Sequence, residues 1–267
     1  MDGIKELDWI ARRKAGEQRT CLSYWFPKIR QAGLPVPRTN ILRVGDQEAR
    51  DLAGAVIDGE PLGSNGRAFV SKLELAAGEI GYPVFLRTGQ TSAKHSWDRT
   101  CYVASREALA QHVFELIEFS ECADLMGLDL RVWVVRELLP TRPVMVAYRG
   151  MPVCREFRLF VDGPEIQCCH PYWPLTALRD GRPRTLDGQP LDDEAVEDLG
   201  HGLWELDDEG CRIVWDLASR AGQACGGRWS VDVLETDRGW HVTDMAAAEL
   251  SWHWPGCQDG ELSKDAG

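Results

Sequence analysis

Hydrophobic positions along this chain follow helical spacing in some segments and strand alternation in others. Helical spacing of apolar residues predicts helices around residues 22–29, 73–80, 109–117 and 213–221. Alternating or continuous apolar runs predict strands over 40–44, 84–87, 101–105, 130–138, 155–161, 165–170, 230–235 and 240–246. Because the strands come in runs rather than in strict alternation with helices, we expect α+β lobes built on antiparallel sheets. This order argues against a TIM barrel or a plain Rossmann sheet.

Composition narrows the class of protein. The chain has 267 residues, of which 44% are hydrophobic, enough for one large domain or two modest lobes. A net charge of −12 provides no basic field for a nucleic acid or an anionic membrane, although a small basic pocket stays possible. The nine cysteines include no Cys-x-x-Cys pair, which favours free thiols in a reducing cytosol over a disulfide frame or a zinc site. With no signal peptide or long apolar span in the sequence, we expect a cytoplasmic protein.

Charged residues interrupt two of the predicted strands. In "CREFRLFV" (154–161), alternation places Arg155 on one face and Glu156 and Arg158 on the other. One interpretation is that these charges pair with each other or with strand neighbours at a wet sheet face. However, Arg136 and Glu137 follow a run too apolar for such a face. The two strands together therefore indicate a cleft in which guanidinium groups meet an anion such as phosphate.

The last predicted hairpin contains two aspartates. If residues 237–239 form a three-residue loop, the register places Asp232 directly opposite Asp244. Two carboxylates about 5 Å apart repel each other unless a cation or a proton intervenes. Such hard oxygen ligands suit Mg²⁺, which is often bound through one or two carboxylates and substrate phosphates. A two-residue turn would instead place the aspartates on opposite faces.

The segment "RTGQTSAKHSW" (87–97) reads as a polar loop that follows a strand ending in Arg87. Its Gly89, its small hydroxyl residues and Lys94 could cover phosphates through backbone N–H groups and an ammonium. The loop is not a Walker A sequence, and no G-x-G-x-x-G follows a strand anywhere in the chain. The polar, turn-rich region 178–200 is expected to be an excursion or a lid.

Together these segments resemble an ATP-grasp protein, and within that superfamily they are most similar to the D123 (cell-division-cycle 123-like) branch. The resemblance covers roughly residues 20–250 and rests on "AGLPVPRT", "GYPVFLRTGQTSAKHSW", "RVWVVREL", "CREFRLFVDG" and "WSVDVLETDRGWHVTDM". It implies an α+β ATP-grasp fold whose two lobes enclose an ATP cleft. The expected divisions are an N-terminal helical and extended segment (1–45), a first lobe with the phosphate-covering loop (46–135), a second lobe with the metal-binding hairpin (136–255) and a tail (256–267).

The resemblance also implies roles for individual residues. Arg87 stands where the family has a phosphate-binding lysine, and Lys94 lies in the phosphate-covering loop. The hinge beside adenine and ribose would contain Arg136, Glu137, Leu138 and Leu139, with Glu137 as a polar contact. Arg155 and Arg158 would face the phosphates or an acyl phosphate, and alternation favours Arg158 of the two. Asp232 and Asp244 would hold magnesium.

One position departs from the family pattern. A third metal ligand, Asn or similar, usually follows two residues after the second acid, where this chain has Ala246. Glu249 could replace it only if the backbone bends back.

Three functions follow from the resemblance. The first is an ATP-dependent ligase that activates a carboxylate as an acyl phosphate for attack by an amine or a similar nucleophile, with ATP and Mg²⁺ as cofactors. The second is an ATP-binding assembly factor for a protein complex, with no ligase turnover, which Ala246 favours. The third is a nucleic-acid end-joining or repair enzyme, against which the net charge argues. The expected partners are a nucleotide and a small-molecule or protein acceptor, with no membrane.

Overall fold

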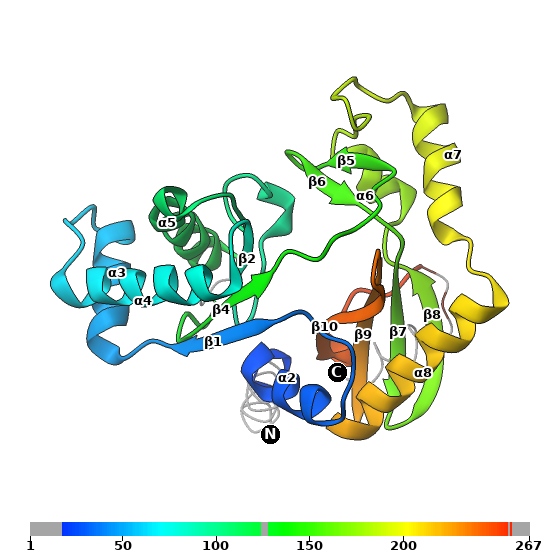
Figure 1. Ribbon diagram of the computed structural model, residues 1–267, viewed down its shortest axis with the longest axis horizontal. Helices are drawn as coiled ribbons and strands as arrows, with labels where there is room; N and C mark the ends of the chain where they lie inside the picture. The colour runs from blue at the N-terminus through cyan, green and yellow to red at the C-terminus, as the bar shows by residue number, and fades with distance from the viewer. Residues whose placement is uncertain (1–17, 124–127, 256, 258–267) are drawn as a thin grey trace, which may run out of the picture.

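The computed structural model describes residues 18–123, 128–255 and 257. Residues 1–17, part of the predicted N-terminal segment, and nearly all of the predicted tail at 256–267 lie outside this range. Two four-stranded antiparallel sheets form two lobes that lie side by side (Figure 1). The α+β class and the antiparallel sheets expected from the sequence are confirmed.

The first sheet has the strand order β1-β4-β2-β3. Its strands are β1 (Thr39–Arg43), β4 (Val132–Glu137), β2 (Val84–Thr88) and β3 (Tyr102–Val103). Three helices pack beside it: α3 (Asp46–Ile57), α4 (Ser64–Ile80) and α5 (Arg106–Cys122). The apolar stripes of α4 and α5 form one core with the strands because both helices turn those stripes to the same sheet face.

The second sheet has the strand order β10-β9-β7-β8. Its strands are β10 (Gly239–Ala247), β9 (Arg228–Thr236), β7 (Glu156–Asp162) and β8 (Glu165–Pro171). Two helices cover it, α8 (Asp208–Cys225) and α2 (Leu22–Gln31), and a 3-10 turn, η2 (Ala248–Leu250), follows β10. Helix α8 comes so close to the β7–β8 turn that a Cβ at Gly222 would lie 2.0 Å from the carbonyl oxygen of Gly163. Only glycine fits there.

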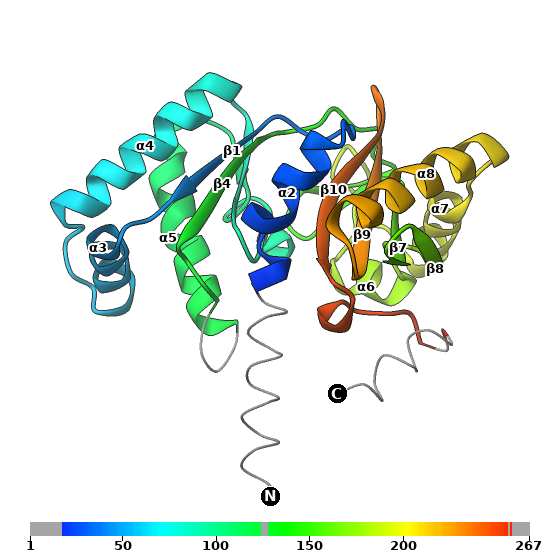
Figure 2. The same ribbon diagram turned by 90° about the horizontal axis from the view of Figure 1, so that it is seen from below.

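Strand β4 is buried on both faces, which explains its continuous apolar run. Trp133 and Val135 pack against the helices of the first lobe, whereas Val132 and Val134 pack in the core that α2 shares with the second sheet. Helix α2 therefore lies between the two sheets (Figure 2). By alternation Arg136 continues the face of Val134, toward the second lobe.

A third, smaller unit lies above the second sheet in Figure 1. It contains a two-stranded hairpin that the sequence did not predict, β5 (Met145–Ala147) and β6 (Met151–Val153). The 3-10 turn η1 (Lys94–Ser96) and the helices α6 (Leu175–Asp180) and α7 (Asp193–Trp204) accompany it. The predicted excursion at 178–200 becomes the end of α6, an irregular stretch and most of α7, and Leu178 and Val196 are buried in the core of this unit.

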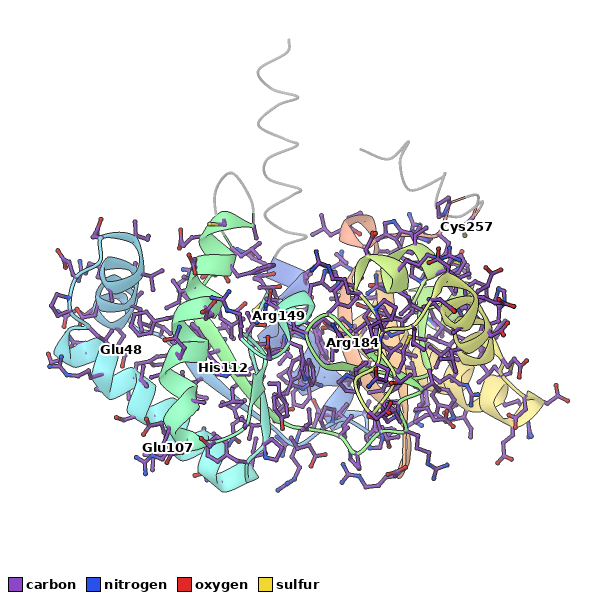
Figure 3. The ribbon with its side chains drawn as sticks, turned by 90° about the horizontal axis from the view of Figure 1, so that it is seen from above. Glu48, Glu107, His112, Arg149, Arg184 and Cys257 are labelled. Atoms are coloured by element: carbon purple, nitrogen blue, oxygen red, sulfur yellow. The ribbon has the colours of Figure 1, made fainter. Side chains whose placement is uncertain are left out.

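Among the described residues, no helix combines the length and the apolar character needed to cross a bilayer. Glu48 and Glu107 lie on the first lobe, and Cys257 lies at the far edge of the second (Figure 3). The domain boundaries expected from the sequence stay a prediction.

Candidate functional site

A cleft lies between the lobes, beside the segment that links β4 to β5. The space inside it is about 930 Å³, counting the part that is open to solvent. Its apolar lining consists of Pro37, Phe85, Trp97, Leu138, Leu139, Met151, Pro152, Cys154, Trp173 and Leu234. Its polar lining consists of Arg87, Ser92, Lys94, Arg136, Glu137, Thr141, Glu156, Thr243 and Asp244. Both lobes therefore contribute to one site.

Arg87 and Arg136 place two guanidinium groups on the same face of the first sheet. Arg136 lies opposite Phe85 in the register of β2 and β4, and Arg87 is two residues further along β2. Their exposed fractions are 3% and 4%. Arg87 donates from Nη1 to Asp244 Oδ2 at 2.8 Å, which connects the two lobes across the cleft.

Arg136 is a buried cation with incomplete hydrogen bonding. Its Nη1 donates to the carbonyl oxygen of Thr243 at 2.6 Å, but Nε and Nη2 have no hydrogen-bond partner in the described part of the chain. Burial lowers the pKa of Arg136 to about 9, and the charge of Arg87 adds to that shift. An anionic ligand would supply the hydrogen-bond acceptors and the opposite charge that this buried guanidinium lacks.

Lys94 joins the same cleft from the loop that follows β2. Its Nζ lies 3.8 Å from Glu156 Oε2 and 3.8 Å from the centre of the Tyr172 ring. Burial by itself would lower the pKa of the Lys94 ammonium, but Glu156 and Tyr172 outweigh burial, so the pKa is raised. The predicted loop residue is thus held as a cation against the second sheet.

Asp232 and Asp244 face each other on β9 and β10, as the sequence predicted, although the predicted loop was wrong. The hairpin has a two-residue turn, which pairs Thr236 with Gly239. In an unbroken ladder that turn would leave the aspartates on opposite faces. A β-bulge at Thr243, between the pairs Val242–Val233 and Asp244–Asp232, shifts the register by one and restores their pairing.

The register of the second sheet forms a row of charged residues across β7, β9 and β10. Arg158 lies opposite Asp232 and binds it with both ends of the guanidinium, at 2.7 and 2.8 Å. Burial disfavours the charged form of Arg158, but Asp232 more than compensates and keeps its pKa above the ordinary value. Arg158 therefore pairs with a residue of the neighbouring strand, which was one of the two interpretations of the sequence. Its guanidinium also lies 4.7 Å from the centre of the Tyr172 ring.

Glu156 adds a third carboxylate to the two aspartates. Its side chain accepts a hydrogen bond from Thr243 Oγ1 at 3.3 Å, and the residue is 8% exposed. Burial raises the pKa of Glu156; Lys94 opposes the shift, and the charges of Asp232 and Asp244 add to it. A bound cation would relieve the repulsion that the two aspartates exert on the Glu156 carboxylate.

This donor set fits magnesium. Oxygen ligands are what Mg²⁺ requires, and the ion is usually completed by waters and phosphate oxygens. A carboxylate offers about four lone-pair sites, so Asp232 and Asp244 can accept from arginine and still bind a cation. Ala246, at the position of the usual third ligand, supplies only a methyl group. Glu249 lies in η2, 3.7 Å from Arg19, and its side chain is 49% exposed.

Two predicted residues make other contacts. Arg155 points away from the cleft, where Nη1 donates to Glu235 at 2.9 Å. Glu137 lines the cleft, but its carboxylate accepts hydrogen bonds from Arg38 at 2.7 Å and from Arg238 at 2.8 Å. The structure brings Arg87, Lys94, Arg136, Glu137, Leu138, Leu139 and Asp244 together in the cleft lining and places Asp232 and Arg158 in the adjoining row.

Sequence reasoning placed Glu156 in the wall of the cleft but gave it no role as a ligand, and it did not include Tyr172 in the site. For Glu156 a signal existed, since alternation places it on the face of Arg158. For Tyr172 no local signal existed, because its position beside Lys94 and Arg158 depends on how β8 pairs with β7.

Two lobes with antiparallel sheets, connected by a segment that lines a cleft with cations and carboxylates, constitute an ATP-grasp fold. Comparison with solved structures agrees. Cdc123 from Schizosaccharomyces pombe matches with a TM-score of 0.53 and 16% sequence identity, over 88% of this chain and 85% of Cdc123. At this identity the similarity shows the fold alone.

Two further matches have lower scores. A RimK domain ATP-grasp protein from Sphaerobacter thermophilus has a TM-score of 0.46 at 16% identity, over 94% of this chain and 65% of that protein. D-alanine–D-alanine ligase from Bacillus anthracis has a TM-score of 0.46 at 11% identity, over 93% of this chain and 62% of the ligase. This chain thus spans less than two thirds of either protein. No protein-family model and no curated protein sequence matches it.

Proposed function

We propose that the cleft binds Mg-ATP and that the protein uses it to activate a carboxylate as an acyl phosphate, which an amine or a similar nucleophile then attacks. The observation that carries the proposal is Arg136, a buried cation with two unbonded nitrogens among the described residues, beside Arg87 in a cleft with a large apolar lining. Such a site combines a binding surface for a flat, apolar ring with one for phosphates.

The nucleotide would lie with its base among the apolar residues of the hinge and of β6. Leu138, Leu139 and Met151 line that part of the cleft. The phosphates would lie against Arg87 and Arg136, with Lys94 reaching them from its loop. Leu138 and Leu139 belong to the expected hinge, while Arg136 lies with the phosphate-binding residues.

Magnesium would be held by Asp244 and Asp232, with Glu156 as a third carboxylate. When bound, the ion neutralises charge on the transferred phosphoryl group. The arginines position the nucleotide, and the buried surroundings strengthen their attraction for its anionic oxygens.

The proposed chemistry needs no nucleophile from the protein. An oxygen of the substrate carboxylate forms a bond to the γ-phosphorus while the bond to ADP breaks. The acceptor nitrogen then forms a bond to the carbonyl carbon, loses a proton, and inorganic phosphate leaves. Arg158 and Lys94 are the candidate groups for stabilising the negative charge that develops, because their side chains meet at Tyr172 beside the carboxylates.

Calorimetry with ATP and Mg²⁺ tests the binding step, and release of ADP and phosphate over a panel of carboxylates and amines tests turnover. We expect saturable binding by the wild type and its loss in Arg136→Met. The matched control is Arg131→Met, because Arg131 precedes the same strand and its side chain is 72% exposed. Equal binding by both variants would contradict the site. Binding without turnover across the panel would contradict the ligase reaction only.

A second candidate is a nucleotide-binding assembly factor without turnover. Two observations favour it: Ala246 at the third-ligand position, and the bidentate engagement of Asp232 by Arg158. Reciprocal pull-down with and without ATP tests it. We expect a protein partner whose capture depends on ATP and is lost in Asp232→Asn, with Asp237→Asn at the hairpin tip as the control. A chain that is always recovered alone would contradict this candidate.

A further inference from the structure

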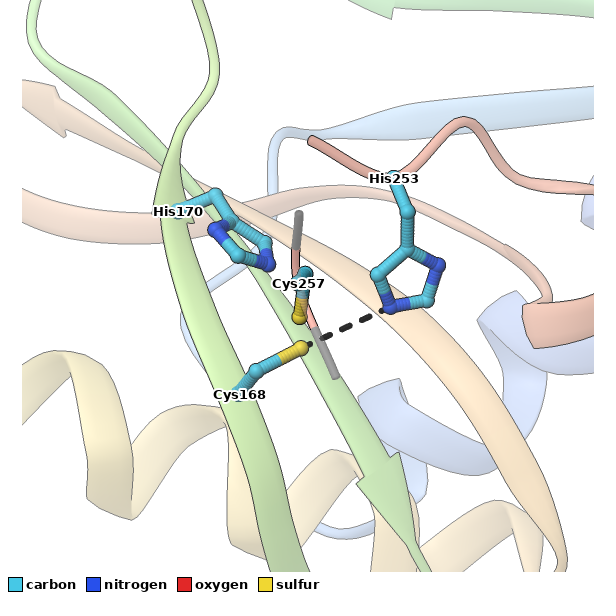
Figure 4. A group of neighbouring side chains, drawn as sticks. All are labelled: Cys168, His170, His253 and Cys257. Carbon is cyan, nitrogen blue, oxygen red and sulfur yellow. Dashed lines mark hydrogen bonds between the residues drawn. The ribbon is translucent and has the colours of Figure 1, made fainter. Parts of the chain in front are cut away.

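Four side chains with metal-ligating atoms meet at the outer edge of the second sheet, away from the ATP cleft. They are Cys168, His170, His253 and Cys257, and one ligand atom of each lies within 4.8 Å of those of the others (Figure 4). Cys168 Sγ and His253 Nε2 are 3.5 Å apart. None of the four belongs to the cleft lining described above.

Two separate segments supply these residues. Cys168 and His170 are two positions apart on β8, the edge strand, so alternation turns both to the same face. His253 and Cys257 follow η2, in the segment that crosses back over the sheet. Each segment contributes one cysteine and one histidine, so the cluster contains no Cys-x-x-Cys pair. For this reason the cysteine spacing in the sequence did not indicate a zinc site.

Contacts other than the cluster itself hold the second segment in place. The His253 ring stacks on Phe160 with centroids 3.3 Å apart, and the Trp254 ring stacks on His170 at 6.1 Å. Trp254 Nε1 donates to the carbonyl oxygen of Pro171 at 2.9 Å. Both imidazoles are therefore oriented by packing, which is the condition that a preformed ligand set requires.

We propose that these residues form a Cys₂His₂ site for Zn²⁺. In a tetrahedral zinc site the metal lies about 2.3 Å from sulfur and about 2.0–2.1 Å from nitrogen. Those bond lengths separate neighbouring ligand atoms by roughly 3.3–3.8 Å, so the 3.5 Å between Cys168 Sγ and His253 Nε2 already fits. The other pairs lie within 4.8 Å, so tetrahedral spacing requires them to approach by no more than about 1.5 Å.

The chemistry of the ligand set selects the ion. Two sulfurs and two imidazole nitrogens suit zinc and disfavour Mg²⁺ and Ca²⁺, which require oxygen. Because the protein supplies four ligands, the site is closed and structural rather than catalytic. Both thiols must lose their protons on binding, so zinc binding releases protons and weakens in acid.

The site would attach the segment after β10 to the edge of the second sheet. His170 lies opposite Arg158 in the register of β7 and β8, and Arg158 lies opposite Asp232. The zinc site and the carboxylate row thus share one sheet face.

The test measures zinc in the full chain, purified without chelators, equilibrated with ZnCl₂ and freed of excess metal. Elemental analysis is expected to find a stoichiometric zinc ion. Replacement by Co²⁺ should give the absorption of a tetrahedral cobalt–thiolate centre, and removal by a strong chelator should lower the melting temperature. Cys168→Ser, His253→Gln and Cys257→Ser should each lose the metal and the cobalt spectrum.

Matched controls are Cys122→Ser, whose thiol is exposed on α5, and Cys225→Ser at the end of α8, both of which should keep the metal. His253 and Cys257 follow the last strand, so those variants keep the proposal testable if Cys168→Ser fails to fold. Absence of zinc from the equilibrated wild type would overturn the proposal. So would full zinc content in Cys257→Ser, or a Cys168–Cys257 disulfide found by peptide mapping of the zinc-equilibrated chain.

Discussion

Arg87 on β2 and Asp244 on β10 form an ion pair of 2.8 Å that connects the two lobes across the cleft. Arg87 is almost fully buried, whereas the Asp244 side chain is 36% exposed. Burial alone would raise the pKa of Asp244, but the charge and hydrogen bond of Arg87 lower it, so the carboxylate stays ionised. One carboxylate therefore connects the lobes and faces the proposed metal.

Asp244→Asn tests this double role. We expect stability to fall by about 1–2 kcal/mol, because the charge-assisted hydrogen bond to Arg87 is weakened and partial exposure of Asp244 limits the loss. Mg²⁺-dependent nucleotide binding should be lost. Denaturant titration and calorimetry measure the two effects, with Asp237→Asn in the same hairpin as the control. Unchanged affinity at equal Mg²⁺ would remove Asp244 from the metal site.

Arg136→Met should stabilise the free protein while it removes nucleotide binding. The guanidinium is buried, and two of its nitrogens lack partners among the residues described, so its replacement by an apolar side chain of similar length removes a desolvation cost. An unsatisfied buried group costs about 1–3 kcal/mol, and we expect a gain of that order. Thermal unfolding with and without Mg-ATP measures it. A variant that is less stable than the wild type without nucleotide would contradict this account of Arg136.

Glu137 should contribute to stability in a pH-dependent way. Burial alone would raise the pKa of its carboxyl, but hydrogen bonds from Arg38 and Arg238 lower it below the ordinary 4.5. Because the pKa is lower in the folded state, this stabilisation is fully present above pH 4.5 and is lost as the pH falls through the folded value.

Glu137→Gln should therefore lower stability near pH 7 and have less effect in acid. The measurement is unfolding by denaturant at pH 7 and at pH values below 4.5. Glu118→Gln, on the exposed face of α5, serves as the control. An equal loss of stability at both pH values would show that the arginine contacts do not depend on the Glu137 charge.

Cys154 should be an unreactive thiol despite its place in the cleft lining. Burial raises its pKa to about 11, so very little thiolate is present near neutral pH. With iodoacetamide at pH 8 we expect the exposed Cys122 to react much faster than Cys154, and Mg-ATP should protect Cys154 further without affecting Cys122. Peptide mapping by mass spectrometry measures both rates. Rapid alkylation of Cys154 in the folded protein would contradict the burial of its thiol.

Much of the fold could be predicted from the sequence because its signals are local. The apolar stripe of α2 and the continuous run of β4 identify a helix and a buried strand without reference to the rest of the chain. The β5–β6 hairpin was missed because its strands are only three residues each, too short to show a period. The side-chain types at 87, 94, 136, 232 and 244 indicated anion and cation chemistry.

The sequence by itself determined most of the element types, the α+β class and the chemistry available to the cleft, since these depend on neighbouring residues and side-chain type. Tertiary structure alone decided which charges meet. The bulge at Thr243 brings Asp244 opposite Asp232, although the two-residue turn by itself would separate them. It also decided that Cys168 meets His253, 85 positions later in the chain. Such contacts depend on strand register and on which distant segments pack together. Neither can be predicted from a local sequence pattern.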